Sequence, residues 1–146
     1  MLFLSIHPEH VRSIAAGRKT VELRKRKPSI EPGSRVVIYA TTPECEVVGV
    51  ATIEAIHVET PTEIWRSHGK QASVTRQAFD AYYAEADKAI GIEIKGFESF
   101  AKPVSLRELR QRWAGFQPPQ QYRYLDQKQQ RFITERKKRS KRYVSA

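Results

Sequence analysis

Residues 17–28 read Gly-Arg-Lys-Thr-Val-Glu-Leu-Arg-Lys-Arg-Lys-Pro, and within this charged stretch lies the pattern of a β-strand. Val21 and Leu23 alternate with the polar residues Thr20, Glu22 and Arg24, and successive side chains of a strand point to opposite faces. We therefore expect a strand over 20–25 with one buried apolar face and one charged face. A regular element holds charged groups in fixed mutual geometry, as a ligand site requires.

Other segments add strands and helices in an irregular order. Apolar or β-branched runs predict strands at 2–6, 35–40, 46–58 (bent at Gly49) and 89–94, after which 97–103 leads out of the sheet. Pro8 and Gly17 bracket a predicted helix over 9–16. Capping patterns predict three further helices. The first begins at Thr60 and ends near Gly69, and the last begins at Ser105 and ends at Trp113. The one between them begins at Ser73 or Thr75 and carries a core-facing stripe of Phe79, Tyr82 and Tyr83.

This order lacks regular βαβ alternation, so a doubly wound parallel sheet is disfavoured. We expect an α+β fold: a small, partly open mixed β-barrel surrounded by helices. The length of 146 residues fits one domain. We place that domain at residues 1–125 and expect a basic helix or tail at 126–146.

Positive charge is concentrated in two segments. The chain carries a net charge of +10, of which residues 18–27 hold +5 and residues 123–142 hold +7, so the remainder is −2. Two basic patches on a mildly acidic body favour a polyanionic partner, of which RNA or another nucleic acid is the obvious class.

Several compartments and chemistries are disfavoured. Cys45 is the single cysteine, so no intramolecular disulfide forms, which fits a reducing cytosol. Its acidic neighbours Glu44 and Glu46 should raise the pKa of the thiol, which argues against a reactive thiolate. No apolar run reaches the roughly 18 residues of a membrane span, and the N-terminus lacks a signal peptide's features. The four histidines show no metal-ligand spacing. We expect a cytoplasmic protein without membrane contact, metal or cofactor.

The chain resembles the ASCH domain, a family of the PUA-like superfold, over roughly residues 2–125. The Gly17-x-Lys19-x-x-Glu22-x-Arg24 motif carries most of this resemblance. Supporting segments are Leu4-Ser5-Ile6, His10-Val11, Pro32-Gly33, Val36 to Ala40, Gly49-Val50-Ala51, Ala89 to Ile94, Pro103 to Leu106 and Pro118 to Leu125.

The resemblance implies a β-barrel whose cleft is lined by this motif and which recognises RNA or nucleotides. Some members of the family are nucleases. One branch is similar to amidohydrolases that remove the acetyl group from N4-acetylcytidine and has a Gly-Arg-Lys-Thr-x-Thr-x-Arg segment. Lys19 matches the lysine of that segment, whereas Glu22 stands in place of its second threonine, which argues against threonine-dependent amidase chemistry here.

Lys19, Glu22 and Arg24 are the central candidates for a site. Arg24 could bind a phosphate through two parallel hydrogen bonds. Glu22 could accept a hydrogen bond from the amino group of a base. Lys19 could neutralise a phosphate, or act as a base or nucleophile if burial lowers its pKa. Because Glu22 would hold Lys19 charged, the pattern favours binding over lysine nucleophilicity. The alternative is an ion-pair ladder on an exposed sheet face.

Further candidates lie outside the motif. Arg26 belongs to the basic run. Tyr39 either stacks a base at the cleft mouth or packs in the core, and Ser73 either reaches the cleft or caps a helix. Tyr122, Arg123 and Tyr124 form either a belt on the barrel, which we favour, or a stacking platform. Arg136, Lys137, Lys138 and Arg139 give the tail general affinity for phosphates.

Three functional hypotheses follow. The first is RNA binding by a PUA-like domain with a nucleotide-sized cleft. The second is an enzyme, either a metal-independent ribonuclease or an amidohydrolase that acts on an N-acylated cytidine, in which Lys19 and Glu22 would be catalytic. The third is a transcriptional regulator or adaptor that contacts another protein.

Overall fold

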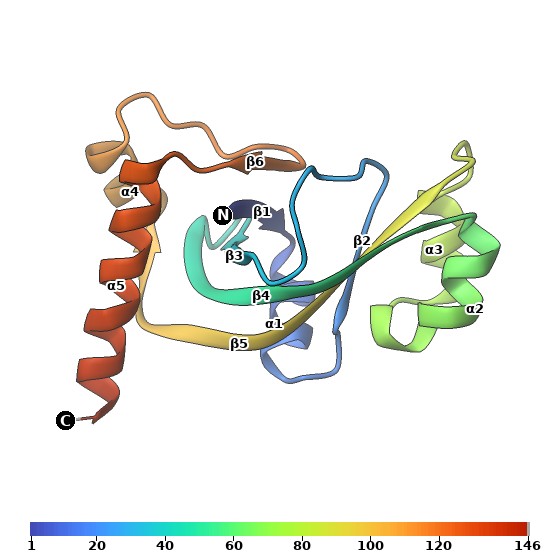
Figure 1. Ribbon diagram of the computed structural model, residues 1–146, viewed down its shortest axis with the longest axis horizontal. Coiled ribbons are helices and arrows are strands. Elements are labelled where there is room, and N and C mark those ends of the chain that lie inside the picture. Colours follow the sequence, from blue (N-terminus) through green and yellow to red (C-terminus); the bar gives the residue numbers. More distant parts are fainter. Residues whose placement is uncertain (146) are drawn as a thin grey trace.

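The computed structural model describes the backbone of residues 1–145 and the side chains of residues 1–138. Six strands form one sheet, and five helices surround it (Figure 1). The strands are β1 (Leu2–Ile6), β2 (Val21–Arg24), β3 (Arg35–Ala40), β4 (Glu46–Glu59), β5 (Ala89–Ser105) and β6 (Tyr122–Tyr124). The helices are α1 (Pro8–Ala15), α2 (Pro61–Ala72), α3 (Arg76–Tyr82), α4 (Leu106–Arg112) and α5 (Gln127–Ser145).

The sheet is mixed and curls into a half-barrel, which confirms the expected partly open barrel. Its strand order is β2-β5-β4-β3-β1-β6, with β1 and β3 parallel and the other pairs antiparallel. The long strands β4 and β5 run together across the molecule, with α2 and α3 at one end and α4 and α5 at the other (Figure 1). None of the described helices is long and apolar enough to span a membrane.

Two elements are longer than expected. β5 continues to Ser105 because β4 remains paired with it as far as Glu46, with register shifts that bend the ladder and do not end it. One shift flanks Gly49, as predicted: a Cβ there would lie 2.3 Å from the Glu98 carbonyl oxygen, so only glycine allows this close approach. α2 continues past Gly69 to Ala72, and Ser73 ends it in the left-handed conformation with φ 53°.

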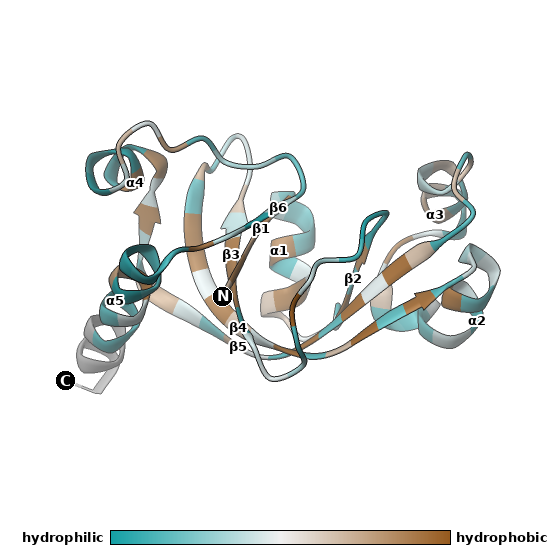
Figure 2. Ribbon diagram, turned by 45° about the horizontal axis from the view of Figure 1, so that its top comes forward, coloured by the Kyte–Doolittle hydropathy of each residue, from teal (hydrophilic) through white to brown (hydrophobic). Residues whose placement is uncertain are grey.

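The core covers both faces of the sheet. On β1, Leu2, Leu4 and Ile6 point into the cluster under α1, whereas Phe3 points into the cluster under α4 and α5. A third cluster joins β2 to α2 and α3. Figure 2 shows hydrophobic segments along the strands of the sheet. The sheet is thereby rigid where β2 presents its charged side chains.

Side chains bridge the two edges of the half-barrel, a region that we call the seam. Arg24, on edge strand β2, donates to the carbonyl oxygens of Ser5 and Gln121, each at 2.9 Å. The Tyr122 hydroxyl donates to the Lys27 carbonyl at 3.2 Å, and the Ser29 amide donates to the Tyr124 hydroxyl at 2.7 Å. These bonds take the place of a backbone ladder between β2 and the opposite edge.

Candidate functional site

A pocket of about 360 Å³ opens at the seam. Segments far apart in sequence line it: the end of β1 and the start of α1, β2 with the preceding Lys19, α3 with the preceding Val74, and the residues before β6. Its lining residues are Ser5, Ile6, His7, His10, Lys19, Glu22, Leu23, Arg24, Val74, Ala78, Phe79, Tyr82, Gln120 and Gln121.

The alternation predicted for β2 places its charges in this pocket. Val21 and Leu23 pack into the cluster with α2 and α3, as expected for the apolar face. The charged face is buried too: Lys19, Glu22 and Arg24 are exposed by only 3%, 7% and 5%. An exposed ion-pair ladder is therefore not what the chain forms.

The three charged groups hold one another and the surrounding backbone. Glu22 Oε1 accepts from Arg24 Nη2 at 3.1 Å, and Glu22 Oε2 lies 3.9 Å from Lys19 Nζ. Lys19 Nζ donates to the carbonyl oxygen of Ala72, the last residue of α2. Arg24 is thus fixed to both edges of the seam and Lys19 to α2, so the cations are positioned before any ligand arrives.

Three buried polar atoms of the pocket lack a hydrogen-bond partner: Ser5 Oγ, Glu22 Oε2 and Arg24 Nε. Buried polar groups are normally paired, and leaving one unpaired costs about 1–3 kcal/mol. The three residues that carry this hydroxyl, carboxylate oxygen and guanidinium N–H all line one pocket. Among the described side chains, five buried polar atoms lack a hydrogen-bond partner, and three of them belong to residues of this pocket.

Burial lowers the pKa of Lys19, and the nearby Arg24 lowers it further. Glu22 raises it, as expected, but its effect is smaller than that of burial, so the pKa of Lys19 is lowered on balance. The pKa of His10 is also lowered, first by burial and next by the charge of Lys19. The pocket therefore contains a neutral imidazole at pH 7 beside a lysine that loses its proton more readily than usual.

Sequence reasoning missed six polar or aromatic residues of the pocket: Ser5, His7, His10, Tyr82, Gln120 and Gln121. The histidines were considered only as metal ligands, and the glutamines only as part of the resemblance. A local signal existed for His10, which lies one turn into the helix that leads to Gly17. No local signal places Gln121 beside Arg24, because 97 residues separate them.

Residues 4–101 match the sequence profile of the ASCH domain. The chain belongs to the ASCH domain family. It is 34% identical over 122 residues to an "ASCH domain-containing ribonuclease" of Zymomonas mobilis, which is 84% of this chain and 82% of that protein.

Solved structures agree with this assignment. The crystal structure of the Zymomonas mobilis ASCH protein superposes with a TM-score of 0.87 at 30% identity, covering 92% of this chain and 93% of that one. A protein from Pseudomonas putida superposes with a TM-score of 0.61 at 14% identity, covering 93% and 98% of the two chains. The second likeness shows the fold alone, which is the PUA-like half-barrel expected from the sequence.

Tyr39 and Ser73, the two residues of this ASCH domain that were candidates to reach the cleft from outside the motif, do not line the pocket. Tyr39 is 2% exposed and packs on Phe3, with ring centroids 5.5 Å apart, in the cluster under α4 and α5. Burial raises its pKa to about 12. It is thus a core residue and not a stacking residue at the pocket mouth. Ser73 is exposed and ends α2, while its neighbours Ala72 and Val74 contact the site.

The β6 aromatic residues of the ASCH domain form the belt that we favoured. Through their hydroxyls Tyr122 and Tyr124 hold the loop that follows β2, although the Tyr124 ring stays 47% exposed. Arg123 lies over the Phe116 ring, 5.1 Å from its centroid. Arg26 is exposed in the loop that follows β2. Burial raises the pKa of the Tyr122 hydroxyl, and the nearby positive charge of Arg26 opposes this increase.

The predicted phosphate-binding cations of the tail divide into two groups. Arg136 donates to both carboxylate oxygens of Glu108, at 2.6 and 3.2 Å, and Lys137 pairs with Glu98 at 3.3 Å. These two residues hold α5 against α4 and β5 and are not free phosphate ligands. Lys138 is exposed, and the side chain of Arg139 lies outside the described residues.

Proposed function

We propose that this ASCH protein binds RNA and takes one nucleotide into the seam pocket. The observation that carries the proposal is that three residues with an unpartnered buried atom, Ser5 (Oγ), Glu22 (Oε2) and Arg24 (Nε), line a single pocket. Such atoms gain their full hydrogen-bond energy only when a ligand supplies the partner.

The complement of this pocket is a nucleobase edge next to a phosphate. Glu22 Oε2 accepts from an amino or imino group of a base, and Arg24 Nε donates to a ring nitrogen or carbonyl. Tyr82, in the pocket wall, offers an aromatic face for stacking. A volume of about 360 Å³ lies in the range of small-ligand sites.

Charge favours RNA as the source of that nucleotide. With Lys19 protonated, the pocket holds two cations against one carboxylate, and exposed basic residues such as Arg26 lie along the same seam. The ribonuclease name of the Zymomonas mobilis relative supports RNA as the class of ligand. A cationic groove beside a base pocket is the usual arrangement for single-stranded nucleic acid.

Fluorescence anisotropy with a labelled single-stranded oligoribonucleotide tests this proposal. We expect Arg24→Lys, which keeps the charge but loses the planar fork, to weaken binding by about tenfold. Lys102→Met, which removes an exposed cation of β5 that lies outside the pocket lining and outside both basic segments, is the matched control and should change affinity less than threefold. Equal affinities for wild type and Arg24→Lys would remove the pocket from the account.

A second candidate function, ribonuclease activity in the same pocket, is favoured by His10 and Lys19. His10, neutral at pH 7, would accept the proton of a ribose 2′-hydroxyl, whose oxygen would then attack the adjacent phosphorus. The bond to the 5′-oxygen would break, that oxygen would take up a proton, and a 2′,3′-cyclic phosphate would remain. Lys19 and Arg24 would stabilise the charge on phosphorus in the transition state.

Incubation with RNA in the presence of EDTA separates binding from cleavage. We expect wild type to produce 2′,3′-cyclic phosphate ends, detected by mass spectrometry, and His10→Ala purified identically to lose them while still binding. An oligonucleotide with a single 2′-deoxy position should bind but resist cleavage there. Absence of cleavage would leave binding alone, and release of acetate from N4-acetylcytidine would favour the amidohydrolase instead.

A further inference from the structure

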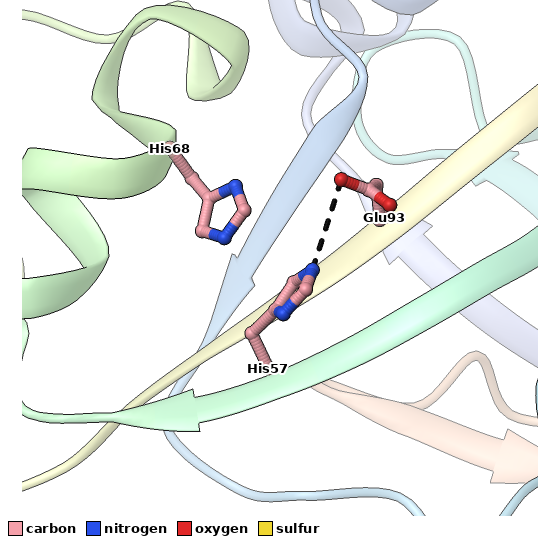
Figure 3. Close-up of side chains that lie close together, drawn as sticks. All are labelled: His57, His68 and Glu93. Carbon is pink, nitrogen blue, oxygen red and sulfur yellow. Dashed lines mark ion pairs between the residues drawn. The ribbon is translucent and has the colours of Figure 1, made fainter.

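A second cluster of polar side chains lies away from the seam pocket, where α2 crosses the far end of β4 and β5. His57 of β4, His68 of α2 and Glu93 of β5 point toward one another (Figure 3). The two imidazole rings stack with centroids 4.2 Å apart, and His57 Nε2 lies 3.7 Å from a carboxylate oxygen of Glu93. None of the three residues lines the seam pocket.

One atom of this cluster is buried and unpartnered. His57 Nε2 has no hydrogen bond, although a carboxylate faces it. A ring nitrogen in this position lacks the partner that buried polar atoms usually have. Because the imidazole and carboxylate side chains remain half-buried, solvent reaches the cluster and an ion has a path to enter.

We propose that His57, His68 and Glu93 bind one divalent transition-metal ion of the zinc class. Two imidazoles and one carboxylate are a common set of protein ligands for Zn²⁺, with a further position left for water. The alkaline earth ions prefer all-oxygen sites, so Mg²⁺ and Ca²⁺ fit this donor set poorly.

The distances fit such a site after a small adjustment. One ligand atom from each residue lies within 4.8 Å of the others. Ligand atoms around a tetrahedral zinc are about 3.4 Å apart, given metal–nitrogen distances near 2 Å. Side-chain rotations that bring these atoms together by about 1.5 Å complete the site without moving the sheet.

The ion would join α2 to the sheet one helical turn from the seam pocket. His68 and Ala72 are four residues apart on α2, and the Ala72 carbonyl accepts the hydrogen bond from Lys19. Metal binding at one end of this turn therefore fixes the backbone group that holds Lys19 at the other end. The sequence offered no sign of this, because 36 positions separate the first and last ligand and only the fold brings them together.

Isothermal titration of tag-free, EDTA-treated protein with ZnCl2 tests the proposal. We expect one saturable site in wild type and at least a tenfold weaker Kd in His68→Ala and in Glu93→Gln. His10→Ala, which removes a histidine outside the cluster, is the matched control and should retain the wild-type Kd. Zinc should also raise the Tm of wild type and of His10→Ala, but not that of His68→Ala.

Each outcome decides the matter. Absence of saturable binding, or a Kd unchanged in both His68→Ala and Glu93→Gln, would leave only a stacked histidine pair facing a carboxylate and would overturn the site. Circular dichroism of the metal-free variants shows whether they fold. If His68→Ala does not fold, the Kd of the near-isosteric Glu93→Gln alone decides whether the site exists.

Discussion

Glu22 lies between two cations in a pocket wall that water hardly reaches. One of its oxygens is bonded to Arg24, and the other has no hydrogen bond. We expect Glu22→Gln to lower the free energy of unfolding by about 1–3 kcal/mol, because the buried Arg24 guanidinium loses its counter-charge while the shape is kept. Glu22→Ala should cost about 3–5 kcal/mol. Urea denaturation measures both, and an unchanged midpoint in Glu22→Ala would contradict the pairing.

Lys19 gives the stability of the protein a pH dependence of defined sign. Its folded-state pKa is lowered from the ordinary value of 10.5, chiefly by burial. Between the two pKa values the unfolded chain binds more protons, so the free energy of unfolding rises with pH in that interval. The free energy of unfolding of wild type, relative to that of Lys19→Met, should therefore increase as the pH rises toward 10.5. If this difference in the free energy of unfolding does not change with pH, or decreases, burial does not lower the pKa of Lys19 in the folded protein.

The residues of β2 were predictable because their signals are local. Alternation over five positions placed Val21 and Leu23 in the core and Glu22 and Arg24 on the other face. The same reasoning could not place Tyr39, because a tyrosine near the end of a strand occurs both in cores and at the rims of pockets. Its packing on Phe3 shows that it is a core residue. The balance between burial and charge at Lys19 also depends on neighbours that no local pattern reveals.

At the scale of elements, α5 is held to the body by ion pairs that the sequence did not indicate. Arg136→Met should lower the free energy of unfolding by about 1–3 kcal/mol at pH 7, since it removes a bidentate bond to Glu108. The control Lys138→Met, at an exposed position, should change it by less than about 0.5 kcal/mol. Arg136 holds the pKa of Glu108 below its ordinary value.

The pH dependence of this pair has the same sign as that of Lys19 but lies in the acid range, because both groups have a lowered folded-state pKa. A carboxylate with a lowered folded-state pKa stabilises the fold above the unfolded value of 4.5, and that contribution is lost as pH falls. The difference between wild type and Arg136→Met should therefore shrink below pH 4.5. A difference that persists at pH 3 would mean that α5 is held by packing and not by this pair.

Element boundaries were predictable where capping residues mark them. Thr60, Thr75 and Ser105 each accept a hydrogen bond from the backbone amide three residues on, as their sequence patterns predicted. The end of β5 was not predictable, because a strand with a glycine near its middle and a proline near its end continues only when a partner strand remains paired with it. That partner is β4, and its length is a property of the sheet.

For the molecule as a whole, the basic C-terminal segment should govern the salt dependence of RNA binding. Deletion of residues 139–146 removes the cations Arg139, Lys141 and Arg142 and spares Arg136 and Lys137, which hold α5. If all three contact phosphates, the slope of log K against log salt should become less steep by about 2 units. Anisotropy titrations at several salt concentrations give this slope, and an unchanged slope would show that the segment makes no phosphate contacts.

The architecture of the half-barrel explains why the site lies at the seam. The sheet leaves two edges unpaired, and the chain bridges them with Arg24, Tyr122 and Tyr124, so polar groups gather where a closed barrel would have a ladder. The fold class was predictable from strand order and family resemblance. That Arg24 serves both as a bridge across the seam and as a ligand group was not, because it depends on which edges meet.

The occupancy of the seam pocket is tested most directly by the NMR signal of the Arg24 Nε–H group. This N–H is buried and unpartnered in the free protein. On titration with a short single-stranded oligoribonucleotide, a nucleotide in the pocket should shift this signal saturably, together with the ring signals of His10. RNA-induced shifts confined to α5, with the Arg24 Nε–H signal unmoved at saturation, would contradict nucleotide binding in the pocket.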